Sequence, residues 1–183
     1  MIKKETSAVR EFVLPLLTSI IHKNVSTLRG IDIGFGGDKI VESFDGCDLP
    51  TPYGKYENYP IDIKCDITQG VPVADSTYDV VYSSHLIEDF VDTDSILKEF
   101  VRICKPAGSI ILVFPDQQKY INFCQSKGTK PNGKHQVPEM GTSYMIKHIN
   151  ALDIILDNEI FAKEVLSYNC IIAFKVKKIT NRN

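Results

Sequence analysis

The chain has 183 residues, of which 43% are hydrophobic and 24% are charged, and its formal net charge at pH 7 is -2. This composition is that of an ordinary globular domain, so a disordered or fibrous protein is excluded. Proteins that neutralise many phosphates concentrate Lys and Arg, and 21 such residues against 23 Asp and Glu argue against a nucleic-acid partner.

The first segment, residues 1–25, is expected to form an amphipathic helix that covers the core or a substrate entrance. Arg10 and Glu11 lie just before its apolar run and no small-residue cleavage site follows, so it does not have the pattern of a signal peptide. The run is also too short to span a bilayer. Pro15 strains the middle of the helix. The apolar stripe consists of Val9, Phe12, Val13, Leu16, Leu17, Ile20 and Ile21.

Between residues 26 and 115, short β-rich apolar runs alternate with helical or turn-rich stretches. This alternation is typical of βαβ units and a parallel sheet. A helix over 96–103 is predicted, because "DTDS" (92–95) can cap it and "KPAG" (105–108) ends it. The expected strands are "LRGIDI" (28–33), "SFDGCD" (43–48), "IDIKC" (61–65), "YDVVYS" (78–83) and "SIILVF" (109–114).

The last third combines a polar segment, a helix and two strands. Residues 116–141 are polar and marked by Gly and Pro, so we expect them to form a lid over a substrate. The runs at 160–168 and 169–178 adjoin, so only a hairpin can join them and the sheet should end in an antiparallel pair. A helix is predicted from about Thr142, because apolar residues follow at helical spacing: Met145, Ile146, Ile149, Leu152 and Ile155.

The cysteines predict neither a zinc site nor a disulfide framework. They are five in number, scattered, and never spaced as CxxC. Buried, reduced thiols in a cytosolic protein are the expected state, so we expect a cytoplasmic location. The cysteines are Cys47, Cys65, Cys104, Cys124 and Cys170.

A glycine cluster, "GIDIGFGGDK" (30–39), follows the first expected strand. Such a cluster indicates a tight turn or a ligand that touches the main chain. The dinucleotide-binding fingerprint requires a third glycine where the chain has Lys39, and the Gly-Lys-Ser/Thr of a P-loop does not occur. The remaining pattern is Asp-x-Gly-x-Gly, with Asp32 closing the strand and Gly34 and Gly36 in the turn.

Here the chain resembles the class I S-adenosylmethionine-dependent methyltransferases, specifically the small type 11-like group. The resemblance runs from about residue 28 to 115 in ordered pieces: "GIDIGFGGDK", "DGCDLP", "IKCDIT", "VPVADSTYDVVYSSHLIEDF" and "LKEFVRICKPAGSIILVFP". It implies an α/β fold with a Rossmann-like, doubly wound, mostly parallel sheet of seven strands that ends in an antiparallel hairpin. It also implies one domain over 1–183, with a cofactor-binding half at 26–115 and a lid, helix and hairpin at 116–183.

The resemblance also implies the cofactor contacts, which fall at strand ends where open α/β sheets bind ligands. Asp48 would accept hydrogen bonds from the ribose hydroxyls, and Asp66 would accept one from the adenine amine. Asp32 would face the methionine ammonium. The main chain at Ser83 would complete that end. The full set expected to bind S-adenosylmethionine is Asp32, Gly34, Phe35, Gly36, Asp48, Asp66, Ile67 and Ser83.

Other interpretations of these residues stay open. Asp48 can be a turn residue, with Asp45 its competitor for the ribose, and Asp66 can cap the following segment. Only about ten residues separate the first two strands, so the family's long first helix must be reduced to a turn. The tyrosines of the segment 49–60 lie near the presumed adenine side or in solvent: Tyr53, Tyr56 and Tyr59.

The chemistry requires chiefly an acceptor held in line with the sulfonium and water excluded. If the acceptor is a hydroxyl, a base must take its proton, and His85, just past the fourth strand, is the best-placed candidate. His135 and Asp116 follow as alternatives. The family's frequent "SSHxLEH" reads "SSHLIED" here, with Asp89 in place of the second histidine. No group of residues has metal-ligand spacing, so we expect no metal.

The expected function is therefore methyl transfer from S-adenosylmethionine to a small-molecule or saccharide-type acceptor at oxygen. No Asp-Pro-Pro-Tyr-like motif follows the fourth strand, which disfavours amino-methylation of nucleobases or glutamine. The alternative is a non-catalytic S-adenosylmethionine-binding subunit or sensor, and a dehydrogenase comes third. We expect a small-molecule substrate and neither nucleic acid nor membrane as partner, and a homodimer stays open.

Overall fold

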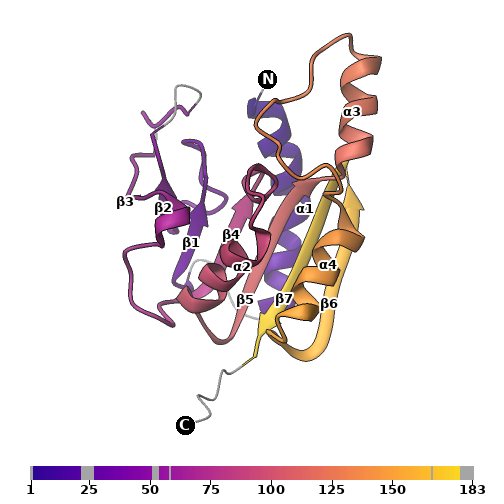
Figure 1. Ribbon diagram of the computed structural model, residues 1–183. Coiled ribbons are helices and arrows are strands. Elements are labelled where there is room, and N and C mark those ends of the chain that lie inside the picture. The colour runs from indigo at the N-terminus through magenta and orange to yellow at the C-terminus, as the bar shows by residue number, and fades with distance from the viewer. Residues whose placement is uncertain (1, 22–26, 51–53, 58, 166, 178–183) are drawn as a thin grey trace.

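A mixed β-sheet forms the centre of the computed structural model, which describes residues 2–21, 27–50, 54–57, 59–165 and 167–177 (Figure 1). Strands β1 to β5 are parallel, whereas β7 runs antiparallel to both β5 and β6. The expected seven-stranded sheet with a C-terminal hairpin is thus confirmed, in the order β3-β2-β1-β4-β5-β7-β6. The strands are β1 (Gly30–Ile33), β2 (Asp45–Asp48), β3 (Ile63–Lys64), β4 (Tyr78–Ser84), β5 (Cys104–Pro115), β6 (Ile155–Val165) and β7 (Asn169–Val176).

The strand order reverses between β1 and β4. From this pair the chain winds one way through β2 and β3 and the other way through β5. In open α/β sheets, ligands bind beyond the carboxyl ends of the strands at this point of reversal. Ile33 is paired with Ser83, so the turns that follow β1 and β4 emerge side by side. The segments that begin at Gly34 and His85 therefore form the candidate site.

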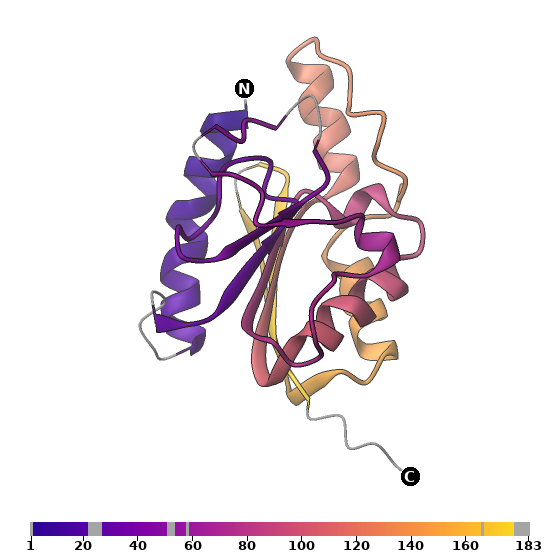
Figure 2. The same cartoon turned by 90° about the vertical axis from the view of Figure 1, so that its left-hand side faces the viewer.

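Helices cover both faces of the sheet. Helix α1 lies on one face, and α2 and α4 lie on the other (Figure 2). Helix α3 stands beyond the carboxyl ends of the parallel strands (Figure 1). The α-helices of the described residues are α1 (Ile2–Ile21), α2 (Thr93–Ile103), α3 (Gln117–Ser126) and α4 (Thr142–Ala151).

Helix α1 packs on the sheet through Val9 and Val13 of its apolar stripe, whereas Phe12, expected in the same stripe, is 40% exposed. Val9 and Val13 are buried in one cluster with Val80 and Tyr82 of β4 and Ile111 of β5. Burial of a valine side chain contributes about 1.5–3 kcal/mol, so this stripe holds the helix in place. The helix therefore covers the core, which is the first of its two expected roles. Within the described part of the chain, no helix combines the length and apolarity needed to cross a membrane.

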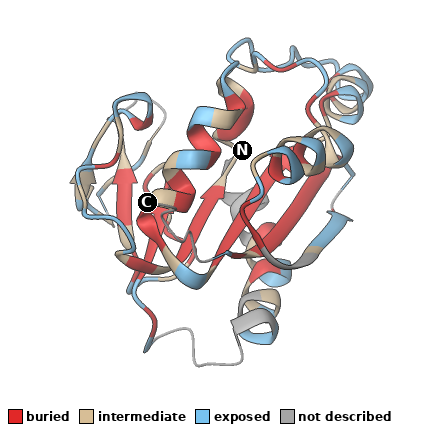
Figure 3. Ribbon diagram, turned by 60° about the horizontal axis from the view of Figure 1, so that its bottom comes forward, coloured by how far each residue is buried: buried red, intermediate tan, exposed pale blue. Residues whose placement is uncertain are grey.

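The opposite face of the sheet carries the larger core cluster. Helix α2 begins at Thr93 and is capped by Asp92, whose side chain accepts a hydrogen bond from the Ser95 N–H at 3.1 Å, as the expected cap predicts. Its apolar side, with Leu97 and Phe100, shares this cluster with Met145 of α4. Figure 3 shows the central strands buried and the helices buried only along the side that faces the sheet.

The C-terminal third differs from the sequence expectation at two places. Helix α4 ends at Ala151 and Ile155 begins β6, so the helical spacing continued by chance into the next element. The segment 116–141 contains helix α3, which was not predicted. Of the residues of α3 only Gln117 and Cys124 are buried, so the helix lacks the apolar stripe by which a helix is identified.

Candidate functional site

Three glycines after β1 form a left-handed turn. Gly34, Gly36 and Gly37 have φ angles of 76°, 61° and 91°, a region that residues with side chains rarely adopt. A Cβ atom on Gly34 would lie 3.0 Å from the Leu86 side chain. One on Gly37 would lie 2.0 Å from the Lys55 carbonyl oxygen, whereas one on Gly36 would meet nothing within 4 Å. The turn is thus packed against protein at two glycines and open to a ligand at the third.

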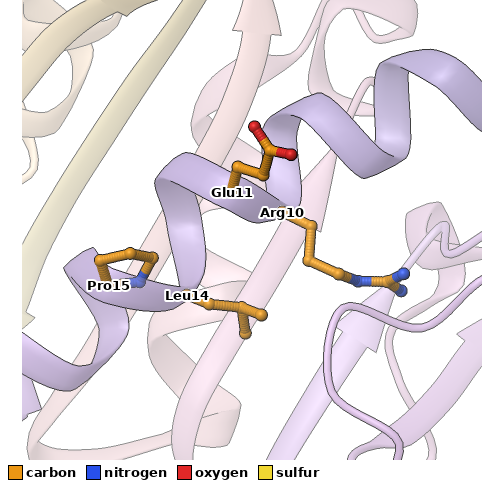
Figure 4. Close-up of a pocket in the computed structure, with 4 residues that line it drawn as sticks. All are labelled: Arg10, Glu11, Leu14 and Pro15. Carbon is orange, nitrogen blue, oxygen red and sulfur yellow. The ribbon is translucent and has the colours of Figure 1, made fainter.

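The connection from β1 to β2, residues 34–44, contains no helix, as its length predicted. Arg10 ties this loop to helix α1, because its guanidinium donates hydrogen bonds to Asp38 Oδ1 at 2.9 Å and to the Lys39 carbonyl. Figure 4 shows Arg10 extending from α1 toward the loop. The hollow beside it holds none of the expected site residues and is lined by Arg10, Glu11, Leu14 and Pro15.

Asp48, the last residue of β2, is bonded directly to the glycine turn. Its Oδ2 accepts hydrogen bonds from the Gly36 N–H at 2.8 Å and from the Tyr56 hydroxyl at 3.1 Å. Burial raises the pKa of Asp48, and these hydrogen bonds oppose that effect. The Tyr56 ring packs edge-on against Phe35, with ring centroids 5.6 Å apart. Of the tyrosines expected near this side, Tyr56 is therefore in contact with the turn, while Tyr53 lies outside the described residues.

Asp32 is buried beneath the turn, with an exposed fraction of 2%. Its Oδ2 accepts a hydrogen bond from the Ile40 N–H at 2.7 Å, which holds the loop 34–44. Its Oδ1 has no hydrogen-bond partner among the described residues. Burial raises the pKa of Asp32 to about 7. Asp32 therefore keeps one acceptor oxygen for which the described chain supplies no donor.

The Asp32→Asn variant is expected to remove on the order of 3 kcal/mol of pH dependence from the free energy of unfolding between pH 5 and pH 8. The folded carboxyl titrates near pH 7 and the unfolded one near 3.8, so the folded state binds more protons in between. Wild-type stability due to this group is therefore lost as the pH rises from about 4 to 7. Urea unfolding of both proteins at the two pH values measures the difference, and an equal loss in both would contradict the raised pKa.

The remaining residues expected to bind the cofactor have structural contacts. Asp66 caps the 3-10 helix η2 (Ile67–Gln69), because its Oδ1 accepts hydrogen bonds from the Thr68 N–H at 3.0 Å and the Thr68 hydroxyl at 2.7 Å. Asp66 therefore caps the following segment, as the alternative interpretation expected, through its Oδ1 atom. Ile67 is buried, and the Ser83 hydroxyl donates to the Ile33 carbonyl at 2.9 Å, joining β4 to β1. Their cofactor contacts stay predictions.

The two histidines proposed as bases, His85 and His135, both lie beside the buried carboxylate of Glu88. His85 Nδ1 is 3.3 Å from Glu88 Oε1, and His135 Nε2 is 3.8 Å from the same oxygen. His135 Nδ1 lies 2.8 Å from Gln117 Oε1, which connects the ring to α3. Burial lowers the pKa of His135, with His85 acting in the same direction and Glu88 against it. The end of β4 and the lid segment therefore form one polar cluster.

Two further acids near this edge, Asp89 and Asp116, differ in their surroundings. Burial, followed by the charge of Glu88, raises the pKa of Asp89 to about 6. Asp116, the third catalytic candidate, is the N-cap of α3, and its Oδ1 accepts a hydrogen bond from the Lys119 N–H at 3.0 Å. The structure thus gives Asp116 a capping role at the start of α3, and its catalytic role stays a prediction.

The lid segment packs against the C-terminal hairpin through aromatic rings. The Tyr120 ring of α3 packs at a tilt on His135, with ring centroids 4.9 Å apart, and edge-on against Tyr168 at 5.1 Å. Tyr168 lies in the turn between β6 and β7. The Tyr120 hydroxyl also accepts a hydrogen bond from the Asn132 N–H at 3.0 Å. Phe123 packs on Tyr168 at 5.0 Å. These contacts hold the segment 116–141 against the turn between β6 and β7, and its role as a lid stays a prediction.

Sequence reasoning missed Glu88 and the direct contact of Tyr56 with Asp48. Glu88 follows His85 by three residues within "HLIED", and an acid at that spacing from a histidine was the available signal. For Tyr56 no local pattern exists, because its contact depends on how the segment 54–57 folds back. No cluster of three His, Cys, Asp or Glu that could hold a metal ion occurs in the described ranges.

Comparison with known proteins places this geometry among methyltransferases. The family model described as "Methyltransferase domain" matches residues 17–112, slightly more than half of the chain. A curated protein of Caenorhabditis elegans, a sterol 4-C-methyltransferase, is 34% identical over 62 residues. That match covers 32% of this chain and only 19% of the nematode protein.

Solved structures share the fold at low sequence identity. A protein from Pyrococcus horikoshii superposes with a TM-score of 0.66 at 18% identity, over 91% of this chain and 89% of its own. A SAM-dependent methyltransferase from Aquifex aeolicus superposes with a TM-score of 0.55 at 12% identity, over 81% of this chain and 82% of its own. The trans-methyltransferase CalH, solved in complex with SAH, superposes with a TM-score of 0.64 at 15% identity, over 92% of this chain and 55% of its own. At such identities the likeness shows the fold alone.

Proposed function

The chain belongs to the methyltransferase-domain family, whose members depend on S-adenosylmethionine, and from this premise we propose that it methylates an oxygen of a small-molecule or saccharide-type acceptor. The observation that carries the proposal is the meeting of two segments at the strand reversal. The glycine turn with Asp48 follows β1 and β2, and the His85 cluster follows β4. A cofactor site and a proton acceptor thus share one edge of the sheet.

The residues of the turn fit the cofactor. Asp32 Oδ1, buried without a donor from the described chain, suits an ammonium group, and the open side of Gly36 lets a nucleoside lie against the backbone. Asp48 is an acceptor for ribose hydroxyls beside Gly36. We propose that these residues, with Gly34, Phe35, Asp66, Ile67 and Ser83, hold S-adenosylmethionine.

When bound, S-adenosylmethionine supplies an activated methyl group, whose carbon–sulfur bond breaks with the electron pair left on sulfur. The chain's own residues orient the acceptor, exclude water and take the proton that the acceptor oxygen loses as the new carbon–oxygen bond forms. His85 is the proposed base, with His135 and Asp116 as alternatives. We propose that the step needs no metal and takes place in the cytoplasm, with neither nucleic acid nor membrane as partner.

A second candidate function is a non-catalytic S-adenosylmethionine-binding subunit or sensor. The segment 54–57 favours it, because the Lys55 N–H donates to the Gly36 carbonyl at 3.1 Å and the Tyr56 hydroxyl donates to Asp48. These contacts occupy groups that the cofactor should use. A site filled in part by its own chain suits regulated binding more than rapid turnover.

Calorimetry and a transfer assay separate the candidates. Titration with S-adenosylmethionine, with NAD as the control, tests the cofactor class. Transfer of a labelled methyl group is then measured on saccharides and other hydroxyl compounds, and on a sterol because the nematode protein is a sterol 4-C-methyltransferase. Methylation at oxygen of any of these compounds supports the proposal, methylation of the sterol at carbon alone contradicts it, and tight binding without any turnover supports the sensor.

The Asp48→Ala variant is expected to weaken S-adenosylhomocysteine binding by on the order of 2 kcal/mol, or about 30-fold. The reason is the loss of a carboxylate that accepts hydrogen bonds from the ribose. Calorimetry measures the affinity, and thermal denaturation checks that the domain remains folded.

Tyr56→Phe is the matched control for Asp48→Ala. It removes the hydroxyl that donates to Asp48 but leaves the carboxylate in place. Because a competitor for that carboxylate is lost, this variant should bind S-adenosylhomocysteine at least as tightly as the wild type. Unchanged affinity in Asp48→Ala would rule out the ribose contact.

A further inference from the structure

Glu88 is an acid with no exposed side-chain surface at the edge of the candidate site. It lies on η3 (Ile87–Asp89), the 3-10 helix that follows β4. Its backbone carbonyl accepts a hydrogen bond from the Gln136 N–H at 2.9 Å, which fastens the lid loop to this helix. The residue therefore stands where the end of β4 meets the lid.

The surroundings of the Glu88 carboxylate supply no hydrogen bond to either oxygen from the described residues. Its neighbours are the rings of His85 and His135, whose nearest nitrogens lie 3.3 and 3.8 Å from Oε1. A buried carboxylate is costly unless a positive charge compensates it. Each ring can supply that charge by taking up a proton, so the carboxylate favours the protonated form of its neighbour.

The backbone of His85 is held in an unusual conformation. Its φ angle is 53°, in the left-handed region, and its N–H donates to the Val113 carbonyl of β5 at 2.8 Å. A non-glycine residue stays in this region only where the surrounding structure fixes it, and such residues cluster at functional sites. The strained turn and the contact with Glu88 together restrict the ring.

We propose that Glu88 is a positioning residue, which holds His85 with Nδ1–H toward its carboxylate and stabilises the protonated ring. Its role in methyl transfer rests on the function proposed above. With Nδ1 facing Glu88, Nε2 is the nitrogen left for the acceptor's proton, and because this atom is buried in the structure, the acceptor must displace the groups that cover it. The positive ring then lies beside a negative carboxylate. A carboxylate orients the histidine of hydrolase triads by the same physical means.

Other charged groups face this pair and must be kept constant. Asp89 is the next residue on η3, and Lys134 and His135 approach from the lid loop. The Glu88 variants retain all three. The comparison among variants therefore isolates the Glu88 carboxylate.

The test is nuclear magnetic resonance titration of the imidazole nitrogens in the full chain, with the His85→Ala spectrum used for assignment. The pH at which His85 takes up its proton should fall by about 1–3 units in Glu88→Gln, and the proton should no longer be confined to Nδ1 in the neutral ring. Glu88→Asp should restore part of the shift. An unchanged midpoint and tautomer in Glu88→Gln would overturn the proposal.

Asp89→Asn is the matched control, because it removes one negative charge a single residue away. It should move the His85 midpoint less than Glu88→Gln does, and an equal movement would show a general charge effect and overturn the positioning role. The titration needs neither cofactor nor acceptor. If His85→Ala keeps its turnover, the proposed base fails, while the titration still decides the pairing.

Discussion

The Gly34→Val variant is expected to lose measurable binding of S-adenosylhomocysteine while the domain remains folded. Gly34 has a φ angle of 76°, where a β-branched side chain is strained. Its Cβ would lie 3.0 Å from the Leu86 side chain, so the added methyl groups must displace Leu86 or enter the space where we propose the cofactor lies. Titration calorimetry measures the binding affinity, and thermal denaturation checks that the domain remains folded.

Gly128→Val separates the loss of the site from the cost of backbone strain. Gly128 also has a left-handed φ, 62°, and a Cβ there would meet nothing within 4 Å. It follows α3 and has no proposed cofactor contact. This control should bind S-adenosylhomocysteine like the wild type. Retained binding in Gly34→Val would show that the turn is only a bend in the chain.

The sheet could be predicted because local patterns and chain connectivity agree. Strands β1, β4 and β5 lie in largely apolar runs, and an acid stands at or next to the end of β1 and β2, namely Asp32 and Asp48. The adjoining apolar runs at the C-terminus leave a hairpin as their only connection, and Asp92 marks the start of α2 by its capping pattern. These signals lie within a few residues of the elements that they predict.

The missed features depend on contacts between distant segments. Helix α3 is held by Tyr120 and Phe123 against Tyr168, which follows Phe123 by 45 residues, and not by an apolar stripe of its own. The burial of Glu88 results from the return of the lid, which brings His135 to it. Such contacts follow from tertiary packing, and neither periodicity nor spacing predicts them.

The His85→Ala variant is expected to lower turnover by roughly 10²–10⁴-fold and to leave S-adenosylhomocysteine affinity nearly unchanged. The reason is that a base takes part only as the acceptor loses its proton. His148→Ala is the matched control, because His148 lies on α4 and pairs with Asp94 at 2.6 Å, without a site contact. Single-turnover rates in the presence of EDTA measure the step itself.

The pH profile distinguishes His85 from the alternative bases. A base must be unprotonated to act, so the wild-type rate should be full at high pH and fall as the pH drops through the titration of that base. In His85→Ala the rate should be low at every pH, and the fall of the rate at low pH should therefore be absent. If His135 is the base instead, the limb lies below the ordinary histidine range, because burial lowers the pKa of His135, and it persists in His85→Ala. Near-normal turnover in His85→Ala would leave His85 as an anchor of the turn after β4, bonded to Val113 through its backbone.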